Sequence, residues 1–342
     1  MSRPTVSVVL AVYNAAWCIE RALDTVMAQS APPLEVIVCD DGSSDGTADL
    51  VERRYGVRVR VMRLPHQNAS AARIPGLAAA SGDWLAFLDA DDWWAPQKLE
   101  RQLEFLEKHP EVRWLTSDGE YISDDGVIRE SWLSDYFEPV RDRVGDLFEP
   151  LARRCYPLMS SMLVDRNAYQ QIGGMDPRIV YSHDFDLWLR LAARFPGAVM
   201  ADRLISYWSH PNALSRNYEA RHRDDLMLME RIAAGELRPE PAMRELGEAR
   251  ASTLAFQIGL NCLRTGRGAE GRAMLRRAAR SGPPRRRMMA TFAASLPDFL
   301  LPQLMRMQWL KGAITSTRAA NHVERDATHP AVATGPDRAD SA

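Results

Sequence analysis

The sequence is poor in cysteine, has no long apolar run and shows almost no excess of one charge. Four cysteines without CxxC spacing argue against a zinc ribbon and a disulfide scaffold, and we expect reduced thiols. No stretch reaches the roughly 18 uninterrupted apolar residues that a membrane-spanning helix needs, since even 288–301 contains Pro297 and Asp298. The first residues, Met1–Thr5, lack the features of a secretory signal, so we expect a cytoplasmic protein.

Two nucleotide-binding signatures are also missing where they would be needed. No G-x-G-x-x-G follows the first expected strand, and the chain has no G-x-x-x-x-G-K-[ST]. A dinucleotide-dependent oxidoreductase and a P-loop kinase are therefore disfavoured. The glycine- and lysine-rich loop expected of a nucleotide-sugar pyrophosphorylase after its first strand is absent as well.

The chain of 342 residues is long enough for two units, and its charge is unevenly distributed. The net charge is 43 minus 45, or −2. Residues 264–311 carry eleven Arg and Lys against two acids, or +9, which leaves −11 for the rest. We therefore expect the C-terminal part to meet anions.

The first hundred residues alternate between buried β-type runs and helical spacing. A doubly wound α/β fold with a mostly parallel, mixed sheet is predicted. The expected strands are 6–12, 36–39, 57–61 and 84–88, and the expected helices are 19–27, 49–54, 70–80, 97–108 and 184–195. We divide the chain into a catalytic domain (1–216), a basic helical appendage (217–316) and a disordered tail (317–342).

Acidic residues gather after the expected strands, where such sheets bind ligands. Asp89, Asp91 and Asp92 place three carboxylates within four residues, and their repulsion favours a bound Mg²⁺ or Mn²⁺. Helix or turn capping is the alternative for any single Asp. The run 40–47 adds carboxylates that accept hydrogen bonds from a base or a ribose, while Tyr13 can stack on a base and Arg73 can meet phosphates.

Taken together, these motifs resemble the family 2 glycosyltransferases of GT-A fold over roughly residues 5–215. The motifs are 8–14, 40–47, Asn68 with Ala72 and Arg73, and 82–92; Asn68-Ala69 and Ala72-Arg73-Ile74 depart from the common pattern. The resemblance implies a DxD motif at Asp89 and Asp91 that holds ribose and metal, with His210 as a third metal ligand. A solvent-facing loop histidine is the alternative for His210. The resemblance also implies a nucleotide-sugar site made of Val12, Tyr13, Asn14, Asp40, Asp41, Arg73, Asp89, Ala90 and Asp91.

Downstream, 172–176 and 183–190 are similar to the family's glycine loop and acidic motif. By that resemblance Asp184 is the catalytic base, although helix capping is an alternative, and His183 stands where an acid is usual. We expect Asp186 to be structural. The expected acceptor residues are Gly174, Ser160 and Trp188.

The predicted function is metal-dependent, inverting transfer of a sugar from a nucleoside-diphosphate sugar. By resemblance, the expected donors are UDP- or dTDP-sugars, and the expected acceptor is a glycan or lipid-linked hydroxyl in cell-surface polysaccharide synthesis. A degenerate GT-A scaffold that only binds nucleotide and a nucleotide-sugar pyrophosphorylase are the alternatives.

The basic appendage has two interpretations. Its arginines alternate with apolar side chains at helical spacing, which favours the inner membrane surface over nucleic acid as a partner. Alternatively, its helices form a lid on the catalytic domain. The membrane hypothesis assigns headgroup contact to Arg276, Arg277, Arg280 and 285–287, and shallow insertion to Met288, Met289, Phe292, Leu300, Leu301, Leu304 and Trp309.

Overall fold

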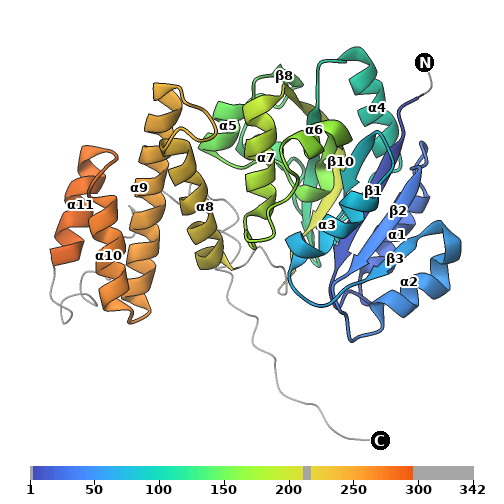
Figure 1. Ribbon diagram of the computed structural model, residues 1–342, viewed down its shortest axis with the longest axis horizontal. Helices are drawn as coiled ribbons and strands as arrows, with labels where there is room; N and C mark the ends of the chain where they lie inside the picture. The colour runs from blue at the N-terminus through green and yellow to red at the C-terminus, as the bar shows by residue number, and fades with distance from the viewer. Residues whose placement is uncertain (1–2, 211–216, 296–342) are drawn as a thin grey trace, which may run out of the picture.

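The computed structural model describes residues 3–210 and 217–295, in which a ten-stranded sheet forms the centre (Figure 1). The strands are β1 (Val6–Val12), β2 (Glu35–Asp40), β3 (Arg60–Arg63), β4 (Trp84–Phe87), β5 (Trp93–Trp94), β6 (Trp114–Ser123), β7 (Gly126–Arg129), β8 (Arg143–Gly145), β9 (Leu163–Asp165) and β10 (Gly197–Trp208). Their order is β3-β2-β1-β4-β9-β6-β10-β5, with β7 beside β6 and β8 beside β10.

The strands β3, β2, β1 and β4 are mutually parallel, and β6 is parallel to β10, whereas β9 runs antiparallel between these groups. In β1, Val8 and Leu10 face one apolar cluster while Val9 faces the other, so the strand is buried on both sides. The register pairs Val12 with Asp40. The carboxyl ends of β1, β2 and β4 consequently share one edge of the sheet.

Helices cover both faces of this sheet. The apolar sides of α1, α2 and α4 belong to one cluster, and those of α3, α6 and α7 belong to the other. The helices of the catalytic part are α1 (Ile19–Met27), α2 (Thr47–Tyr55), α3 (Ala69–Ala79), α4 (Lys98–Lys108), α5 (Phe148–Arg153), α6 (Arg166–Gln171) and α7 (His183–Arg194). The predicted α/β class is confirmed.

Four further helices extend the molecule to one side (Figure 1). They are α8 (Tyr218–Ala233), α9 (Pro241–Arg264), α10 (Gly268–Ala278) and α11 (Pro284–Ser295). α8 and α10 both pack on α9, and α11 packs on α10. No helix within the described ranges is both long and apolar enough to cross a bilayer.

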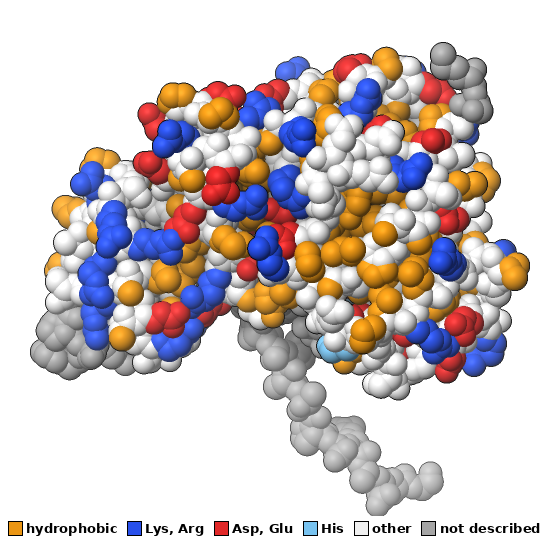
Figure 2. Space-filling model, in the orientation of Figure 1, with side chains coloured by type: hydrophobic (Ala, Val, Ile, Leu, Met, Phe, Trp, Pro, Cys, Tyr) orange, Lys and Arg blue, Asp and Glu red, His pale blue; other side chains and the backbone are white. Residues whose placement is uncertain are grey.

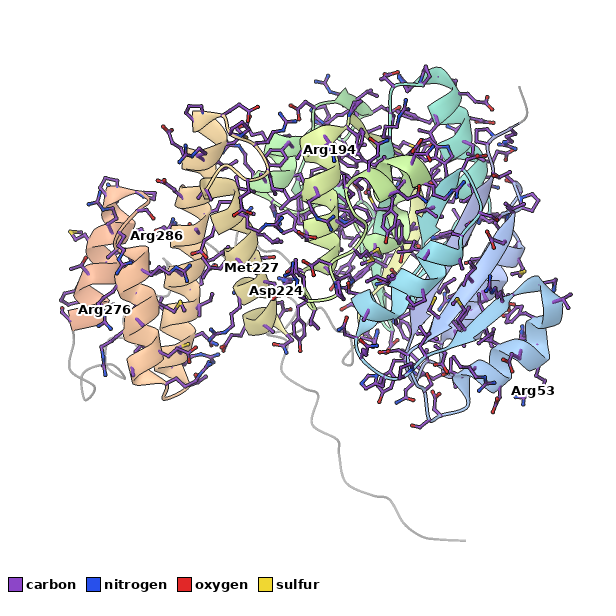
Figure 3. All side chains as sticks on the ribbon, in the orientation of Figure 1. Arg53, Arg194, Asp224, Met227, Arg276 and Arg286 are labelled. Atoms are coloured by element: carbon purple, nitrogen blue, oxygen red, sulfur yellow. The ribbon has the colours of Figure 1, made fainter. Side chains whose placement is uncertain are left out.

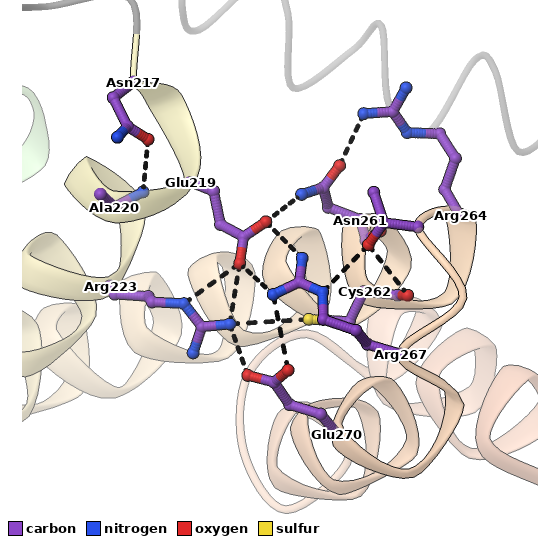
Figure 4. Close-up of polar contacts among 10 residues, drawn as sticks. Asn217, Glu219, Ala220, Arg223, Asn261, Cys262, Arg264, Arg267 and Glu270 are labelled. Carbon is purple, nitrogen blue, oxygen red and sulfur yellow. Dashed lines mark hydrogen bonds and ion pairs between the residues drawn. The ribbon is translucent and has the colours of Figure 1, made fainter.

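An ionic network ties α8 to α10 (Figure 4). Glu219 accepts from Arg223 at 2.9 Å and pairs with Arg267 at 2.5 Å. Glu270 completes the set by accepting from Arg223 at 2.5 Å. The carboxylates of Glu219 and Glu270 therefore hold Arg223 and Arg267 inside the appendage.

The appendage docks on the catalytic domain through α8. Arg231 on α8 contacts buried Asp186 on α7 at 2.8 Å, and Ser182 donates to Asp225 at 2.7 Å. Leu226, Leu228, Met229 and Ile232 of α8 also lie in the apolar cluster that contains Phe185 and Leu187 of α7. The docking surface is thus apolar and includes one ion pair to the buried Asp186 and one hydrogen bond from the buried Ser182 hydroxyl.

Two sequence expectations need correction. The alternating valines predicted a strand over 57–61, but Gly56 adopts φ 54°, a single 3₁₀ turn follows, and β3 begins only at Arg60. Val57 is fully exposed as a result. The lid interpretation needs correction in its extent: α8 packs on the catalytic domain through apolar side chains, whereas α10 packs on α9 and α11 packs on α10. The expected tail (317–342) lies outside the described residues.

Candidate functional site

The loops after β1 and β2 are hydrogen-bonded to each other at the edge of the sheet. Asn14 has φ 49°, a left-handed conformation that turns the chain immediately after β1. Its side-chain oxygen accepts from the Ser44 backbone at 2.9 Å, and its own backbone N–H donates to Ser43 Oγ at 2.9 Å. Asp40 is buried and accepts from the Ser43 backbone at 3.2 Å. These bonds fix the position of both loops.

Asp41 lies beneath a pair of stacked rings. Its buried carboxylate accepts from the Gln67 backbone at 2.8 Å and lies 3.0 Å from His66 Nδ1. The His66 ring stacks on Tyr13 with centroids 4.1 Å apart. Tyr13 is nevertheless 49% exposed. A partly open aromatic platform with a carboxylate at its base is the arrangement that a nucleobase requires.

His66 was missed from the sequence because it belongs to an irregular loop. Its position depends on Gly42, which has φ 75° and lies so close that an added Cβ would be 2.9 Å from the His66 backbone nitrogen. The available signal was the glycine in the acidic loop, since a positive φ brings two backbones together only where no side chain intervenes.

Arg73 connects the DxD segment to the segment that carries Asp184. Its guanidinium is 3% exposed; it donates to Asp89 and lies 3.1 Å from His183 Nε2. His183 Nδ1 lies 2.9 Å from the Val180 carbonyl, which can only accept, so Nδ1 carries the proton and Nε2 accepts from Arg73. Burial lowers the pKa of His183, which agrees with a neutral ring. Arg73 therefore positions Asp89 and His183, and it does not lie open to a phosphate.

The second acid of the DxD motif contacts the late histidine. Asp91 Oδ2 lies 2.8 Å from His210 Nε2, although 119 residues separate them. The rings of Trp17 and Trp208 lie 5.1 and 5.2 Å from the His210 ring. The structure thus brings together two of the three expected metal ligands. Trp17 and Trp208 were not predicted as part of the site; their signal was their place directly after β1 and at the end of β10.

Asp92 holds the loop of the DxD motif (89–91) in place through hydrogen bonds. It is almost fully buried, accepts from Ser160 Oγ at 2.5 Å and accepts from the Trp208 backbone at 3.2 Å. Ser160 Oγ also accepts from the Asp89 backbone at 3.0 Å. Burial, followed by repulsion from Asp91 and Asp89, raises the pKa of Asp92 well above its usual value. Asp92 and Ser160 therefore act as supports for the loop.

The donor set around Asp91 fits a hard divalent cation. One carboxylate and one imidazole suit Mn²⁺, and both Mg²⁺ and Mn²⁺ are commonly held by few protein groups plus substrate phosphates. Within residues 3–210 and 217–295, no group of three or more His, Cys, Asp and Glu side chains is arranged to hold a metal. A site here would consequently take its remaining ligands from a bound diphosphate.

Asp184 lies in the first turn of α7 and is only partly buried. Its Oδ1 accepts from the Phe185 backbone at 2.7 Å, whereas the helix cap is Ser182. Asp184 follows His183 in the sequence, and Arg73 makes hydrogen bonds to both His183 and Asp89. A carboxylate at a helix start, one oxygen held and one without a partner among the described residues, is positioned to accept a proton.

The other downstream residues differ in exposure. Asp186 is buried and pairs with Arg190 at 2.5 Å and Arg231 at 2.8 Å, in agreement with a structural role. Trp188 is fully buried against Phe87, which leaves no ring face for an acceptor. Ser160 is equally buried. Gly174 has φ 70° and lies against the Tyr169 hydroxyl, so it shapes the loop before α7.

A cavity of about 410 Å³ is lined by residues 135–137, by α5 and by the residues that follow α5. Tyr136, Tyr156 and Arg154 are among its lining residues, and the Arg154 guanidinium lies over the Tyr136 ring at 4.2 Å. Burial, followed by the charge of the Asp184 carboxylate, raises the pKa of the Cys155 thiol, which lies between Arg154 and Tyr156 in the sequence. Aromatic rings and guanidinium groups are common contacts for sugars and anions.

The fold is of the GT-A type. The crystal structure of S. aureus TarS 1-349 superposes with a TM-score of 0.62 at 18% identity, covering 95% of this chain and 92% of that one. The mannosyltransferase PcManGT from Pyrobaculum calidifontis, solved with GDP-Man and Mn²⁺, superposes with a TM-score of 0.54 at 19% identity, covering 96% and 89%. At these identities the likeness concerns the fold.

The chain belongs to glycosyl transferase family 2, whose model matches residues 7–163. It is 32% identical over 219 residues to TuaG of Bacillus subtilis, named as a teichuronic acid biosynthesis glycosyltransferase, covering 63% of this chain and 83% of TuaG. It is 27% identical over 214 residues to WfaP of Escherichia coli, named UDP-Glc:alpha-D-GlcNAc-diphosphoundecaprenol beta-1,3-glucosyltransferase, covering 62% and 80%. The predicted family and enzyme class are confirmed.

Proposed function

We propose that this glycosyltransferase transfers a sugar from a UDP- or dTDP-sugar to a hydroxyl of a glycan or lipid-linked acceptor during cell-surface polysaccharide synthesis, in the cytoplasm. The names of TuaG and WfaP support the pathway and the donor. The observation that carries the proposal is the bridge from Asp89 through Arg73 to His183, since it joins the DxD loop to the segment of Asp184.

The donor nucleotide would occupy the edge formed by β1, β2 and β4. Tyr13 offers an exposed ring for stacking, and the Asp41 carboxylate retains lone pairs that can accept from a base N–H. One oxygen of Asp89 accepts from Arg73, and the other has no hydrogen-bond partner among the described residues, so it would contact the ribose or the cation. Val12, Asn14 and Asp40 set the backbone of these loops, and Ala90 separates the two acids of the DxD motif.

Asp91, with His210 and Asp89, would hold Mg²⁺ or Mn²⁺. When bound, the cation neutralises the charge that develops on the departing diphosphate. The chain's own contribution is to fix these ligands: Asp92 and Ser160 hold the loop from below, and Trp17 and Trp208 pack around His210. Contacts of this kind keep metal-ligating side chains in the orientation that binding requires.

Asp184 would act as the general base. As the acceptor oxygen forms a bond to the anomeric carbon, the bond from that carbon to the diphosphate oxygen breaks, and the hydroxyl proton passes to Asp184. Attack from the face opposite the leaving group inverts the configuration. The neutral His183 beside Asp184 adds no negative charge, in contrast to an acid at that position.

We place the acceptor in the cavity bordered by Tyr136, Tyr156 and Arg154, because it presents aromatic and cationic groups that can contact sugars and anions. This replaces Ser160 and Trp188, which are buried. Gly174 contributes by shaping the loop that precedes α7.

A panel of nucleoside-diphosphate sugars tests the proposal. With Mn²⁺ present, UDP- or dTDP-sugars should raise the melting temperature while GDP-sugars do not, and a ligand at 100 times its Kd adds about 2.7 kcal/mol of stability. In the Asp91→Ala variant the stabilisation should no longer depend on Mn²⁺. Equal stabilisation by every nucleotide, or none with any, contradicts the donor site. Donor binding without hydrolysis or transfer identifies a non-catalytic scaffold.

A further inference from the structure

The outermost helix of the appendage turns part of its apolar surface to solvent. On α11, Ala290 and Ala293 are buried against the neighbouring helices, whereas Met288 is 68% exposed and Phe292 is 49% exposed. These two side chains are four residues apart, so they lie on the same side of the helix. Large apolar side chains gathered on one exposed helix face indicate a contact surface.

The arginines of this region fall into two groups. Those facing inward have partners: Arg277 pairs with Glu230, and Arg286 donates to Thr253. The outward group consists of Arg276, Arg280, Arg285 and Arg287, all exposed and without an ion-pair or hydrogen-bond partner among the described residues. Figure 2 shows a band of Lys and Arg side chains over α10 and α11, and Figure 3 labels Arg276 and Arg286 on these helices.

The outward arginines flank one turn. Arg276 and Arg280 lie at the end of α10, and Arg285 and Arg287 lie at the start of α11. Within residues 268–295, Glu270 is the single acid, and it already pairs with Arg223 and Arg267. No carboxylate of this hairpin therefore compensates the four positive charges, and the site selects an anionic partner.

We propose that this outer face, defined as Arg276, Arg280, Arg285, Arg287, Met288 and Phe292, binds the surface of an anionic phospholipid bilayer. Arginines attract acidic headgroups, and neighbouring Met and Phe insert shallowly below them. Nucleic acid fits less well, because Phe292 is the single aromatic ring of the face and strand binding uses several stacking rings. α10 and α11 also lie at the end of the molecule that is farthest from the sheet, so membrane contact there leaves the sheet edge open (Figure 1).

The experiment measures binding of the full chain to vesicles. Flotation with phosphatidylcholine vesicles containing phosphatidylglycerol should recover the protein, while pure phosphatidylcholine vesicles should not, and added salt should weaken binding. Neutralising all four arginines (R276Q, R280Q, R285Q, R287Q) should reduce vesicle affinity by roughly fivefold per residue, or roughly 600-fold in total. Met288→Ser with Phe292→Ser should also weaken binding.

Matched controls come from the opposite end of the molecule. Arg53 is exposed on α2 without a partner among the described residues and Val57 is fully exposed, so R53Q and V57S remove a charge and an apolar side chain far from the outer face (Figure 3). Both should leave vesicle binding unchanged. Circular dichroism and the donor affinity should be the same in every variant, which separates this proposal from the proposed function.

Three results would overturn the proposal. One is equal binding to neutral and anionic vesicles, and another is anionic binding that the four arginine changes leave intact. The third is no binding to vesicles at all, whether or not the chain binds nucleic acid or forms a dimer in the same buffer.

Discussion

Arg73→Met should destabilise the protein more than the loss of an exposed arginine would. Its side chain is 3% exposed, and its guanidinium donates one hydrogen bond to Asp89 and one to the His183 ring. Because the guanidinium is charged, each of these hydrogen bonds is worth about 1.5–3 kcal/mol. Because Asp89 is 34% exposed, water can hydrogen-bond to its carboxylate once Arg73 is replaced. We therefore expect the free energy of unfolding to fall by about 2–4 kcal/mol.

Urea denaturation followed by tryptophan fluorescence measures this change. Arg63→Met is the control: Arg63 pairs with Asp49 and Glu52, but all three side chains are at least half exposed, so its loss should cost below about 1 kcal/mol. A double-mutant cycle with Asp89→Asn should show coupling. Equal losses for Arg73→Met and Arg63→Met, or strict additivity with Asp89→Asn, would refute the bridge.

Three further predictions concern other parts of the molecule. Burial, assisted by Arg221, lowers the pKa of His222 from 6.5 to about 4. The unfolded chain therefore binds more protons between these values, and about 3 kcal/mol of stability should disappear as pH falls from 6.5 to 4, but not in His222→Gln. Gly197→Ala should cost about 1–3 kcal/mol by urea denaturation, because the new methyl group would overlap the Trp114 indole. Chelation with EDTA should weaken UDP-sugar binding measured by calorimetry, and Asp91→Asn should remove that sensitivity; an unchanged affinity after chelation would argue against the metal role.

The parallel half of the sheet could be predicted because its residues determine it locally. Continuous β-branched runs such as Val6–Val12 can be buried on both faces only inside a covered sheet, and the acids that follow must then meet at one edge. The strand expected over 57–61 was wrong because alternation alone cannot detect the chain reversal at Gly56. Short strands such as β8 and β9 depend on pairing partners far along the chain and leave no periodic signal.

The candidate site, like the fold, could be predicted from the sequence only in part. Asp91 and His210 could be proposed from motifs, yet their contact spans 119 residues and only the folded sheet brings them together. Ser160 and Trp188 look like surface candidates in sequence, but the packing of η3 (Met159–Ser161) and α7 buries both. His66 has no motif at all, since its place on Tyr13 follows from the close approach at Gly42. Burial and long-range contacts are properties of the packed chain.

The most direct test of the account compares Asp184→Asn with the wild type at saturating donor and metal. The account predicts unchanged donor affinity and a transfer rate lower by about 10²–10⁴, because the base acts mainly in the transition state. Asp202→Asn, which alters a partly exposed carboxylate paired with Arg101, should transfer at the wild-type rate. Near wild-type transfer by Asp184→Asn would contradict the assignment of the base.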